Sequence, residues 1–165
     1  MKKAYFAGGC FWGMEELLRS APGVLDTEVG YAGGTLESPT YNDVKTGSTG
    51  HAESVQVTFD NQKLSYRTLL KDWFFKIHDP TTINRQGNDR GTQYRSAIFY
   101  LNDQQKEIAE SVIKEIDENG SWGAPIVTRL EPARSFTPAE TYHQDYLQKN
   151  PRGYTCHYAR DDLTF

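Results

Sequence analysis

The chain has 165 residues, which is enough for one domain with a buried core. Hydrophobic residues make up 37% and charged residues 24%, a balance that excludes a globally disordered protein. The formal net charge is -4, and no run of Lys or Arg suits nucleic acid or an anionic membrane surface. No apolar run approaches the roughly 20 residues of a membrane span, and Lys2–Ala7 is too short for a secretory signal, so we expect a cytoplasmic protein.

Helices and strands alternate along the predicted chain. Short apolar or alternating runs predict strands, and longer runs with helical periodicity predict helices. In chain order the expected elements are strand Lys3–Ala7, helix Cys10–Ser20, strand Val24–Tyr31, strand Glu53–Phe59, helix Leu64–Ile77, strand Ser96–Leu101, helix Asp103–Glu118, strand Ile126–Leu130 and a helix from Thr137 to about Lys149. The last helix is predicted from a capping box between Thr137 and Glu140, with Pro138 at its first position.

This order predicts an α+β fold. We expect a two-layer α/β sandwich in which helices cover a mostly antiparallel or mixed sheet, with a ferredoxin-like split βαβ core. Two long polar stretches, 35–52 and 79–93, interrupt the elements, and loops of this length inside a compact domain are often functional. No repeat or linker is visible, so residues 1–165 form a single domain with a loop-like, mobile tail at 150–165.

Cys10 stands in the most informative segment, Gly8-Gly9-Cys10-Phe11-Trp12-Gly13, between a predicted strand and a predicted helix. A thiol at a helix N-terminus meets unpaired N–H groups and the positive end of the helix dipole, so we expect a lowered pKa and a reactive thiolate. The alternative is a buried, unreactive cysteine. Gly13 excludes a Cys-x-x-Cys motif, and the spacing of the two Cys and four His matches no common zinc pattern.

Three further clusters carry chemical groups. Glu53 follows Gly50-His51-Ala52 where a loop enters a strand; a buried carboxyl there would have a raised pKa and could act as a general acid, whereas an exposed one would simply face solvent. The segment 86–95 suits either a polar pocket or an exposed turn. Cys156 in the tail is either a thiol that attacks an oxidised cysteine or an unreactive surface thiol.

Five segments, in the same order along nearly the whole chain, together resemble the peptide methionine sulfoxide reductases of the A type. They are Gly9–Gly13 (GCFWG), Gly30–Gly34 (GYAGG), Thr49–Glu53 (TGHAE), His78–Ser96 (HDPTTINRQGNDRGTQYRS) and Ala139–Gln144 (AETYHQ). The resemblance implies reduction of methionine-S-sulfoxide, free or in proteins, and hence repair of oxidatively damaged proteins.

The resemblance also implies a role for each matching residue. Cys10 would be the nucleophile and Glu53 the acid that protonates the sulfoxide oxygen. Tyr41 and Tyr94 would hydrogen-bond that oxygen, and Asp89 would organise polar groups in the pocket. Phe11 and Trp12 would form the apolar wall against the substrate methyl group. These roles follow from the resemblance and not from spacing.

Recycling is implied in the same way. Cys156 matches the family's resolving cysteine, which would condense with a Cys10 sulfenic acid to give a disulfide that thioredoxin reduces. The family needs no metal or organic cofactor. The tail departs from the family pattern Gly-Tyr-Cys-His because Thr155 intervenes, which affects the geometry of the resolving step and not the first chemical step.

Three other functions remain open from the residues. A hydrolase or transferase would pair Cys10 with His51, His78 or His143. A peroxidase would use the same two cysteines on hydrogen peroxide. A binding module for exposed Met or aromatic segments would use the aromatic side chains and need no lowered thiol pKa. We expect a monomer, because no extended apolar stripe is left over after the core is assigned.

Overall fold

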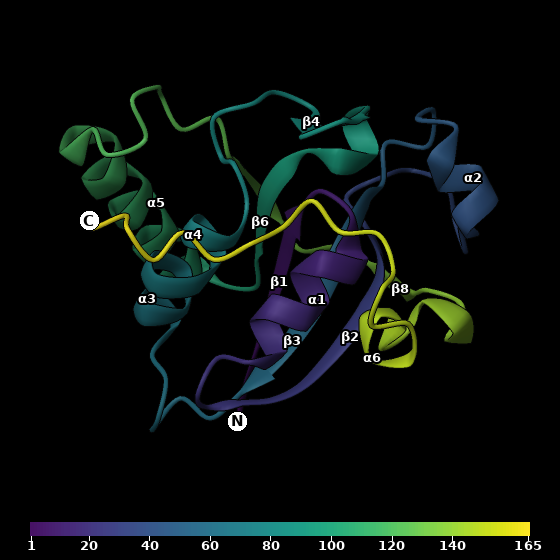
Figure 1. The fold of residues 1–165 in the computed structure, drawn as a ribbon, viewed down its shortest axis with the longest axis horizontal. Helices are drawn as coiled ribbons and strands as arrows, with labels where there is room; N and C mark the ends of the chain where they lie inside the picture. The colour runs from purple at the N-terminus through teal and green to yellow at the C-terminus, as the bar shows by residue number, and fades with distance from the viewer.

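The computed structural model describes all residues from Met1 to Phe165 and is built on a six-stranded sheet in the order β7-β6-β1-β3-β2-β8 (Figure 1). The strands are β1 (Lys2–Gly8), β2 (Val24–Ala32), β3 (Ala52–Phe59), β6 (Ser96–Tyr100), β7 (Arg129–Pro132) and β8 (Phe136–Pro138), with β4 (Arg85–Gln86) and β5 (Asp89–Arg90) forming a separate hairpin. The helices are α1 (Phe11–Arg19), α2 (Tyr41–Lys45), α3 (Tyr66–Thr68), α4 (Phe75–Ile77), α5 (Asp103–Asn119) and α6 (Tyr146–Lys149). None of them combines the length and apolar character that a membrane crossing requires.

The four central strands give the expected ferredoxin-like core. They lie in the order β6-β1-β3-β2 and pair antiparallel throughout. Helix α1 connects β1 to β2, and a second helical segment connects β3 to β6, which is the split βαβ arrangement. That second segment runs from Tyr66 to Ile77, two residues shorter at its start than the predicted Leu64–Ile77, and its middle, Leu69–Phe74, is π-helical. Strand β7 adds parallel to β6 after the α5 crossover, so the sheet is mixed.

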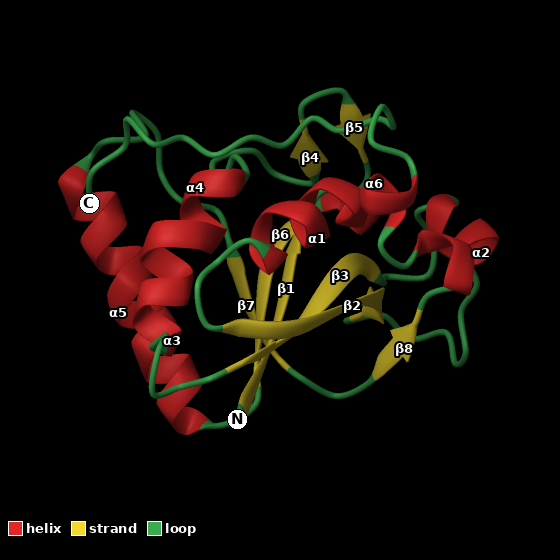
Figure 2. Ribbon diagram, turned by 60° about the horizontal axis from the view of Figure 1, so that its bottom comes forward, coloured by secondary structure: helices red, strands yellow, loops and turns green.

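The main core lies between the sheet and the helices on one of its faces (Figure 2). Alternate residues of β3, Val55, Val57 and Phe59, are buried in it, as the sequence alternation predicts. Leu18 of α1 and Phe74 of the second helical segment pack against them in the same cluster. The other face carries a small cluster of alanines around Phe99. The α+β sandwich predicted from the order of elements is therefore confirmed.

Both long polar stretches contain more structure than predicted. Residues 35–52 include α2, whose N-terminus is closed by a capping box between Thr40 and Asp43: Asp43 N–H donates to Thr40 Oγ1 at 3.3 Å, and Thr40 N–H donates to Asp43 Oδ2 at 3.0 Å. Residues 79–93 include the β4–β5 hairpin. The strand predicted at Ile126–Leu130 is shifted to Arg129–Pro132, because Val127 N–H donates to Pro80 O at 2.8 Å instead of joining the sheet.

The long helix predicted from Thr137 is wrong. Pro138 ends strand β8 and lies opposite Gly30 of β2. The Glu140 carboxylate does not close a capping box; it accepts hydrogen bonds from Tyr31 Oη at 2.7 Å and Tyr41 N at 2.9 Å. Asp145 then adopts a left-handed conformation, with φ of 55°, that no α-helix continues through. Partners distant in sequence thus replace the local capping contacts, and only the four residues of α6 are α-helical.

The tail after Lys149 contains no helix or strand, as predicted, and runs across the molecule from α6 towards α5 (Figure 1). It is held at several points. The His157 ring Nε2 lies 2.7 Å from Gly8 O, Arg160 N–H donates to Lys76 O at 3.0 Å, and Ser121 Oγ donates to Thr164 O at 2.9 Å. The mobility of this tail stays a prediction.

Candidate active site

The register of the sheet brings three functional segments together beside the C-terminal end of the central strand β1. Strand β1 ends at Gly8, two residues before Cys10. Its neighbour β3 runs antiparallel with Ser54 opposite Ala7, which places Glu53 beside the end of β1. On the other side of β1, Ser96 of β6 lies opposite Gly8, so the residues just before β6, including Tyr94, also lie beside the end of β1. The strand order thus brings together Cys10 and Tyr94, which are 84 positions apart in sequence.

Cys10 is the N-cap residue of α1. Its carbonyl accepts the first helical hydrogen bond, from Met14 N–H at 3.4 Å, and its thiol is only 7% exposed. The chain turns into the helix at Gly9, which has φ of +97° and whose missing side chain would lie 2.6 Å from Gln86 Cγ. Only glycine satisfies both constraints, so the Gly-Cys sequence sets the direction in which the thiol points.

A cavity of about 110 Å³ opens beside the thiol. Eight residues line it: Cys10, Phe11, Trp12, Tyr41, Glu53, Asp89, Tyr94 and Tyr154. Seven of them are predicted site residues, so the structure gathers all but one of the predicted set. The exception is Cys156, whose Sγ lies 3.9 Å from Gln86 O, outside the lining. Tyr154, two residues before it in the tail, does line the cavity, and the sequence analysis assigned it no role.

Glu53 is buried in this cavity with 2% of its surface exposed, which excludes the alternative of a carboxyl facing solvent. Burial raises its pKa to about 8; the hydrogen bond from Phe11 N–H to Oε1, at 3.2 Å, lowers it, and the charge of Asp89 raises it again. The predicted upward shift is therefore confirmed. At neutral pH the Glu53 carboxyl holds its proton and is able to donate it.

The expected low pKa of Cys10 is wrong. Burial raises the pKa of the Cys10 thiol far above its usual range, and the nearby Glu53 carboxylate raises it further. The Trp12 backbone N–H lowers it, as a helix N-terminus should, but does not offset the loss of hydration. The thiol of the free protein therefore keeps its proton at neutral pH, and a thiol pKa measured by alkylation does not separate a catalytic Cys10 from an unreactive one.

The phenols in the cavity also keep their protons. Burial raises the pKa of Tyr41 to about 12, and burial likewise raises the pKa of Tyr94, with the charge of Glu53 adding to both. Tyr154 Oη donates to Asp89 Oδ2 at 3.2 Å, while burial raises the Asp89 pKa. The Tyr41 and Tyr94 hydroxyls therefore keep the protons that they need to donate hydrogen bonds in the cavity.

Trp12 is held by His143, which was expected at the site only as a possible base, and by Tyr146, to which the sequence patterns gave no role. Its indole Nε1 donates to His143 Nδ1 at 3.0 Å, and its ring stacks on Tyr146 with centroids 3.8 Å apart. Glu140 supports another lining residue, because it accepts a hydrogen bond from the Tyr41 backbone N–H at 2.9 Å. Because a helix was predicted over this region, the supporting contacts of Glu140, His143 and Tyr146 were not expected, although Ala139–Gln144 is one of the segments that resemble the family.

None of the three histidines considered for a hydrolase is hydrogen-bonded to Cys10. The His51 ring contacts Leu36 O at 2.7 Å, and the His78 ring lies 2.7 Å from both Phe74 O and Ser96 Oγ. The His143 ring accepts from Trp12, and burial lowers its pKa. No group of three or more His, Cys, Asp or Glu residues is arranged to hold a metal ion. The cavity offers a thiol, two carboxyl groups and three phenols.

Comparison with known proteins agrees with this chemistry. The family model described as "Peptide methionine sulfoxide reductase" matches residues 2–164. Peptide methionine sulfoxide reductase MsrA of Nocardia farcinica is 53% identical over 161 residues, covering 98% of this chain and 92% of the relative. The crystal structure of reduced Mxr1 from Saccharomyces cerevisiae superposes with a TM-score of 0.90 at 42% identity, covering 97% and 92% of the two chains. Mxr1 in complex with Trx2 superposes with a TM-score of 0.64 at 30% identity, covering 97% and 90%.

Proposed function

Because the chain belongs to the peptide methionine sulfoxide reductase family, we propose that it reduces methionine-S-sulfoxide to methionine in the Cys10 cavity, acting on the free amino acid and on oxidised proteins. One observation carries the proposal most directly. A thiol and a carboxyl that is protonated at neutral pH, Cys10 and Glu53, line the same small cavity. A sulfoxide needs both, since its sulfur must be attacked and its oxygen protonated before it can leave.

The first step transfers the sulfoxide oxygen to Cys10. The Cys10 sulfur attacks the sulfoxide sulfur while Glu53 gives its proton to the oxygen, and the S–O bond breaks as hydroxyl passes to Cys10. Methionine leaves, reduced by two electrons, and Cys10 becomes a sulfenic acid, oxidised by two electrons. Tyr41 and Tyr94 donate hydrogen bonds to the oxygen while its negative charge develops.

Glu53 serves this step as a proton relay. Both Cys10 and Glu53 carry protons at neutral pH. After Glu53 has protonated the oxygen, its carboxylate accepts the proton that Cys10 must lose to attack. The step thus moves one proton from sulfur to oxygen without exchange with solvent, and Glu53 returns to its starting state. The negative charge of Asp89 favours the proton on Glu53 at the start of the cycle.

The remaining steps restore the thiols. Cys156 attacks the Cys10 sulfenic acid, which forms a disulfide and releases water, and a thioredoxin dithiol then reduces that disulfide by exchange. Both cysteines are free in the structure. Cys156 lies outside the cavity lining, so the tail moves to bring it to Cys10. A reducing compartment keeps thioredoxin in the dithiol form that this step consumes, and we therefore place the protein in the cytoplasm.

The substrate methyl group fits the apolar part of the cavity. Phe11 and Trp12 contribute apolar surface to the same cavity that the polar groups of Glu53 and Tyr94 line. A sulfoxide has one methyl group, one oxygen and one long side chain on a pyramidal sulfur. The resemblance to the A-type reductases assigns the S configuration at sulfur, and a lining with both apolar and polar groups is suited to distinguish the two epimers.

A single turnover without reductant tests the proposal. The parent protein should form about one methionine per chain from a stoichiometric excess of methionine sulfoxide and lose both thiols. The Cys156→Ser variant should form the same amount and leave a Cys10 sulfenic acid that a dimedone probe traps. Methionine formation by a Cys10→Ser variant would contradict the proposal. If hydrogen peroxide oxidises both thiols of the parent while the sulfoxide yields no methionine, the result would favour a peroxidase.

A further inference from the structure

A buried carboxylate lies on α1, one helical turn beyond the cavity. Glu15 is only 1% exposed, and charged side chains are almost never fully buried unless they are paired. It does not line the cavity, and none of the reaction steps uses it. It lies on helix α1, whose N-cap residue is Cys10, so the contacts that Glu15 makes bear on how this helix is held at the cavity.

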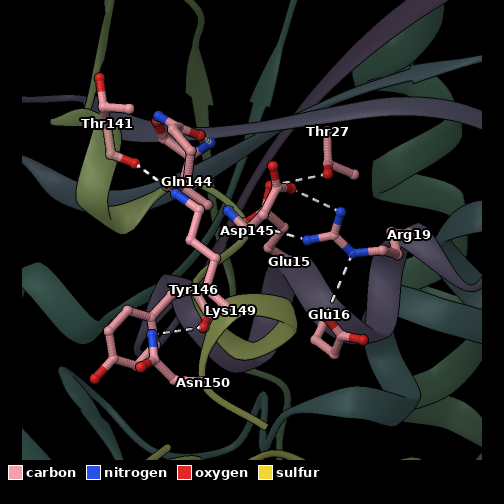
Figure 3. A network of polar contacts seen from close by, with 11 residues as sticks. Glu15, Glu16, Arg19, Thr27, Thr141, Gln144, Asp145, Tyr146, Lys149 and Asn150 are labelled. Atoms are coloured by element: carbon pink, nitrogen blue, oxygen red, sulfur yellow. Dashed lines mark hydrogen bonds and ion pairs between the residues drawn. The ribbon is translucent and has the colours of Figure 1, made fainter.

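Both Glu15 oxygens are engaged, and their partners come from three parts of the chain (Figure 3). Thr27 Oγ1 of β2 donates to Oε2 at 2.9 Å. The Asp145 backbone N–H donates to Oε1 at 2.9 Å, and Arg19 Nη2 lies 3.4 Å from the same oxygen. Glu15 therefore ties helix α1 to strand β2 and to the segment immediately before α6.

Asp145 is the unusual partner because its backbone is left-handed, with φ of 55° and ψ of 34°. A non-glycine residue in this conformation is strained and persists only where surrounding contacts fix it. Two contacts do so: Glu15 takes its N–H, and Arg19 Nη1 donates to its carboxylate at 2.8 Å. The preceding residue, Gln144, pairs its side-chain amide with both backbone groups of Val29, each at 2.9 Å.

The residue that follows Asp145 supports the substrate cavity. Tyr146 stacks on Trp12 with centroids 3.8 Å apart and ring planes at 12°. Trp12 and Glu15 lie three residues apart, on neighbouring positions of the same helix face. Helix α1 thus contacts one segment twice, through Trp12 and Tyr146 at the cavity wall and through Glu15 and Asp145 one turn away.

We propose that Glu15 is a positioning residue that fixes Trp12 through Asp145 and Tyr146, and thereby sets how closely the cavity fits the methyl group on the substrate sulfur. The inference rests on the proposed function. If the Asp145 N–H loses its acceptor, the left-handed turn relaxes and Tyr146 no longer presses on the Trp12 ring. The cavity then widens on its apolar side while the thiol, the acid and the phenols stay in place.

A comparison of two substrates tests this role. Methionine sulfoxide and ethionine sulfoxide differ by one methylene on the sulfur, and a close-fitting apolar wall distinguishes one methylene by about tenfold or more in kcat/KM. We expect this preference in the parent, with dithiothreitol as reductant. Glu15→Ala should reduce the preference to about twofold, mainly through a higher KM for methionine sulfoxide. Glu15→Gln retains an acceptor for the Asp145 N–H and should keep most of the preference.

Matched variants keep the test decisive. Glu16 neighbours Glu15 on α1 and pairs with Arg19 at 3.3 Å, but neither a hydrogen bond nor an ion pair joins it to Asp145, so Glu16→Ala should retain the parental preference. Tyr146→Ala should reproduce the loss, and adding Glu15→Ala to it should change the preference no further. If Glu15→Ala does not fold, Tyr146→Ala and Glu15→Gln carry the comparison.

Two outcomes would overturn the inference. A folded Glu15→Ala protein with the parental preference shows that Glu15 does not act on the cavity wall, as does an unaltered preference in Tyr146→Ala. An active parent is the internal control in both cases. A parent that reduces neither substrate would instead overturn the proposed function, on which the inference depends.

Discussion

Replacing Glu53 by Gln should make the protein more stable and at the same time inactive. The folded structure raises the Glu53 pKa from 4.5 to about 8, so folding favours the protonated form. In the unfolded chain this carboxyl ionises above pH 4.5, and the stability that the protonated form contributes is lost as the pH rises from 4.5 to 8. From these two pKa values, keeping Glu53 protonated at pH 7 costs on the order of 3 kcal/mol.

Gln avoids that cost. It is uncharged at every pH, has nearly the same shape, and its Oε1 can accept the hydrogen bond that Phe11 N–H now donates to Glu53. We expect Glu53→Gln to be more stable than the parent by about 3 kcal/mol at pH 7, by only about 1 kcal/mol at pH 5, and by more at pH 8. For a chain of this size, 3 kcal/mol corresponds to a rise in Tm on the order of 5 to 10 °C.

Urea unfolding of parent and variant at pH 5, 6, 7 and 8 measures this difference. A stability difference that does not change with pH would refute the assigned protonation state of Glu53, as would a variant less stable than the parent at pH 8. Activity supplies the other half of the test. Loss of a general acid costs about 10² to 10⁴ in rate, and a reductive step within a factor of about three of the parent, ~0.7 kcal/mol, would contradict the acid role.

Three further predictions concern the tail and the oxyanion contacts. Cys156→Ser should complete one reduction per chain but turn over poorly with thioredoxin, and undiminished steady-state turnover would refute its resolving role. Tyr94→Phe removes one hydrogen bond to the developing charge and should slow the reductive step about tenfold or more with little change in KM; stopped-flow single turnovers measure this, and an unchanged rate would remove Tyr94 from the mechanism. Gly13→Ala places a Cβ against Thr155 Oγ1 and 2.5 Å from His157 Nδ1, so the tail should detach from α1 and become cleavable by limited proteolysis, whereas parental resistance would show that the tail accommodates the methyl group.

Local sequence patterns predicted most of the central fold. Two of these patterns depend only on residues close in sequence: the strict alternation over Glu53–Phe59 and the helix-breaking pair Pro22-Gly23. The structure has strand β3 and the end of helix α1 where the two patterns place them. The helix predicted over 103–118 is observed as α5, which ends one residue later than predicted, at Asn119. Gly120 follows it in the left-handed conformation that the Asn-Gly pair predicts.

The part that failed depends on contacts distant in sequence. The capping pattern at Thr137 was overridden because Glu140 binds Tyr31 and Tyr41, about 100 residues earlier in the chain. The support of Trp12 by His143 spans 131 residues, so no local signal reports it. A lowered Cys10 pKa was predicted from the helix terminus alone, whereas burial beside Glu53 has the larger effect.

The central claim is that Cys10 reduces one epimer of methionine sulfoxide. Methionine formation from the S and R epimers, with dithiothreitol as reductant, should be measured for the parent and for Cys10→Ser. Turnover of the S epimer by the parent, no turnover of the R epimer, and no turnover of either by Cys10→Ser is the predicted result. A folded parent that reduces neither epimer, or a Cys10→Ser variant that retains S-epimer turnover, would contradict it.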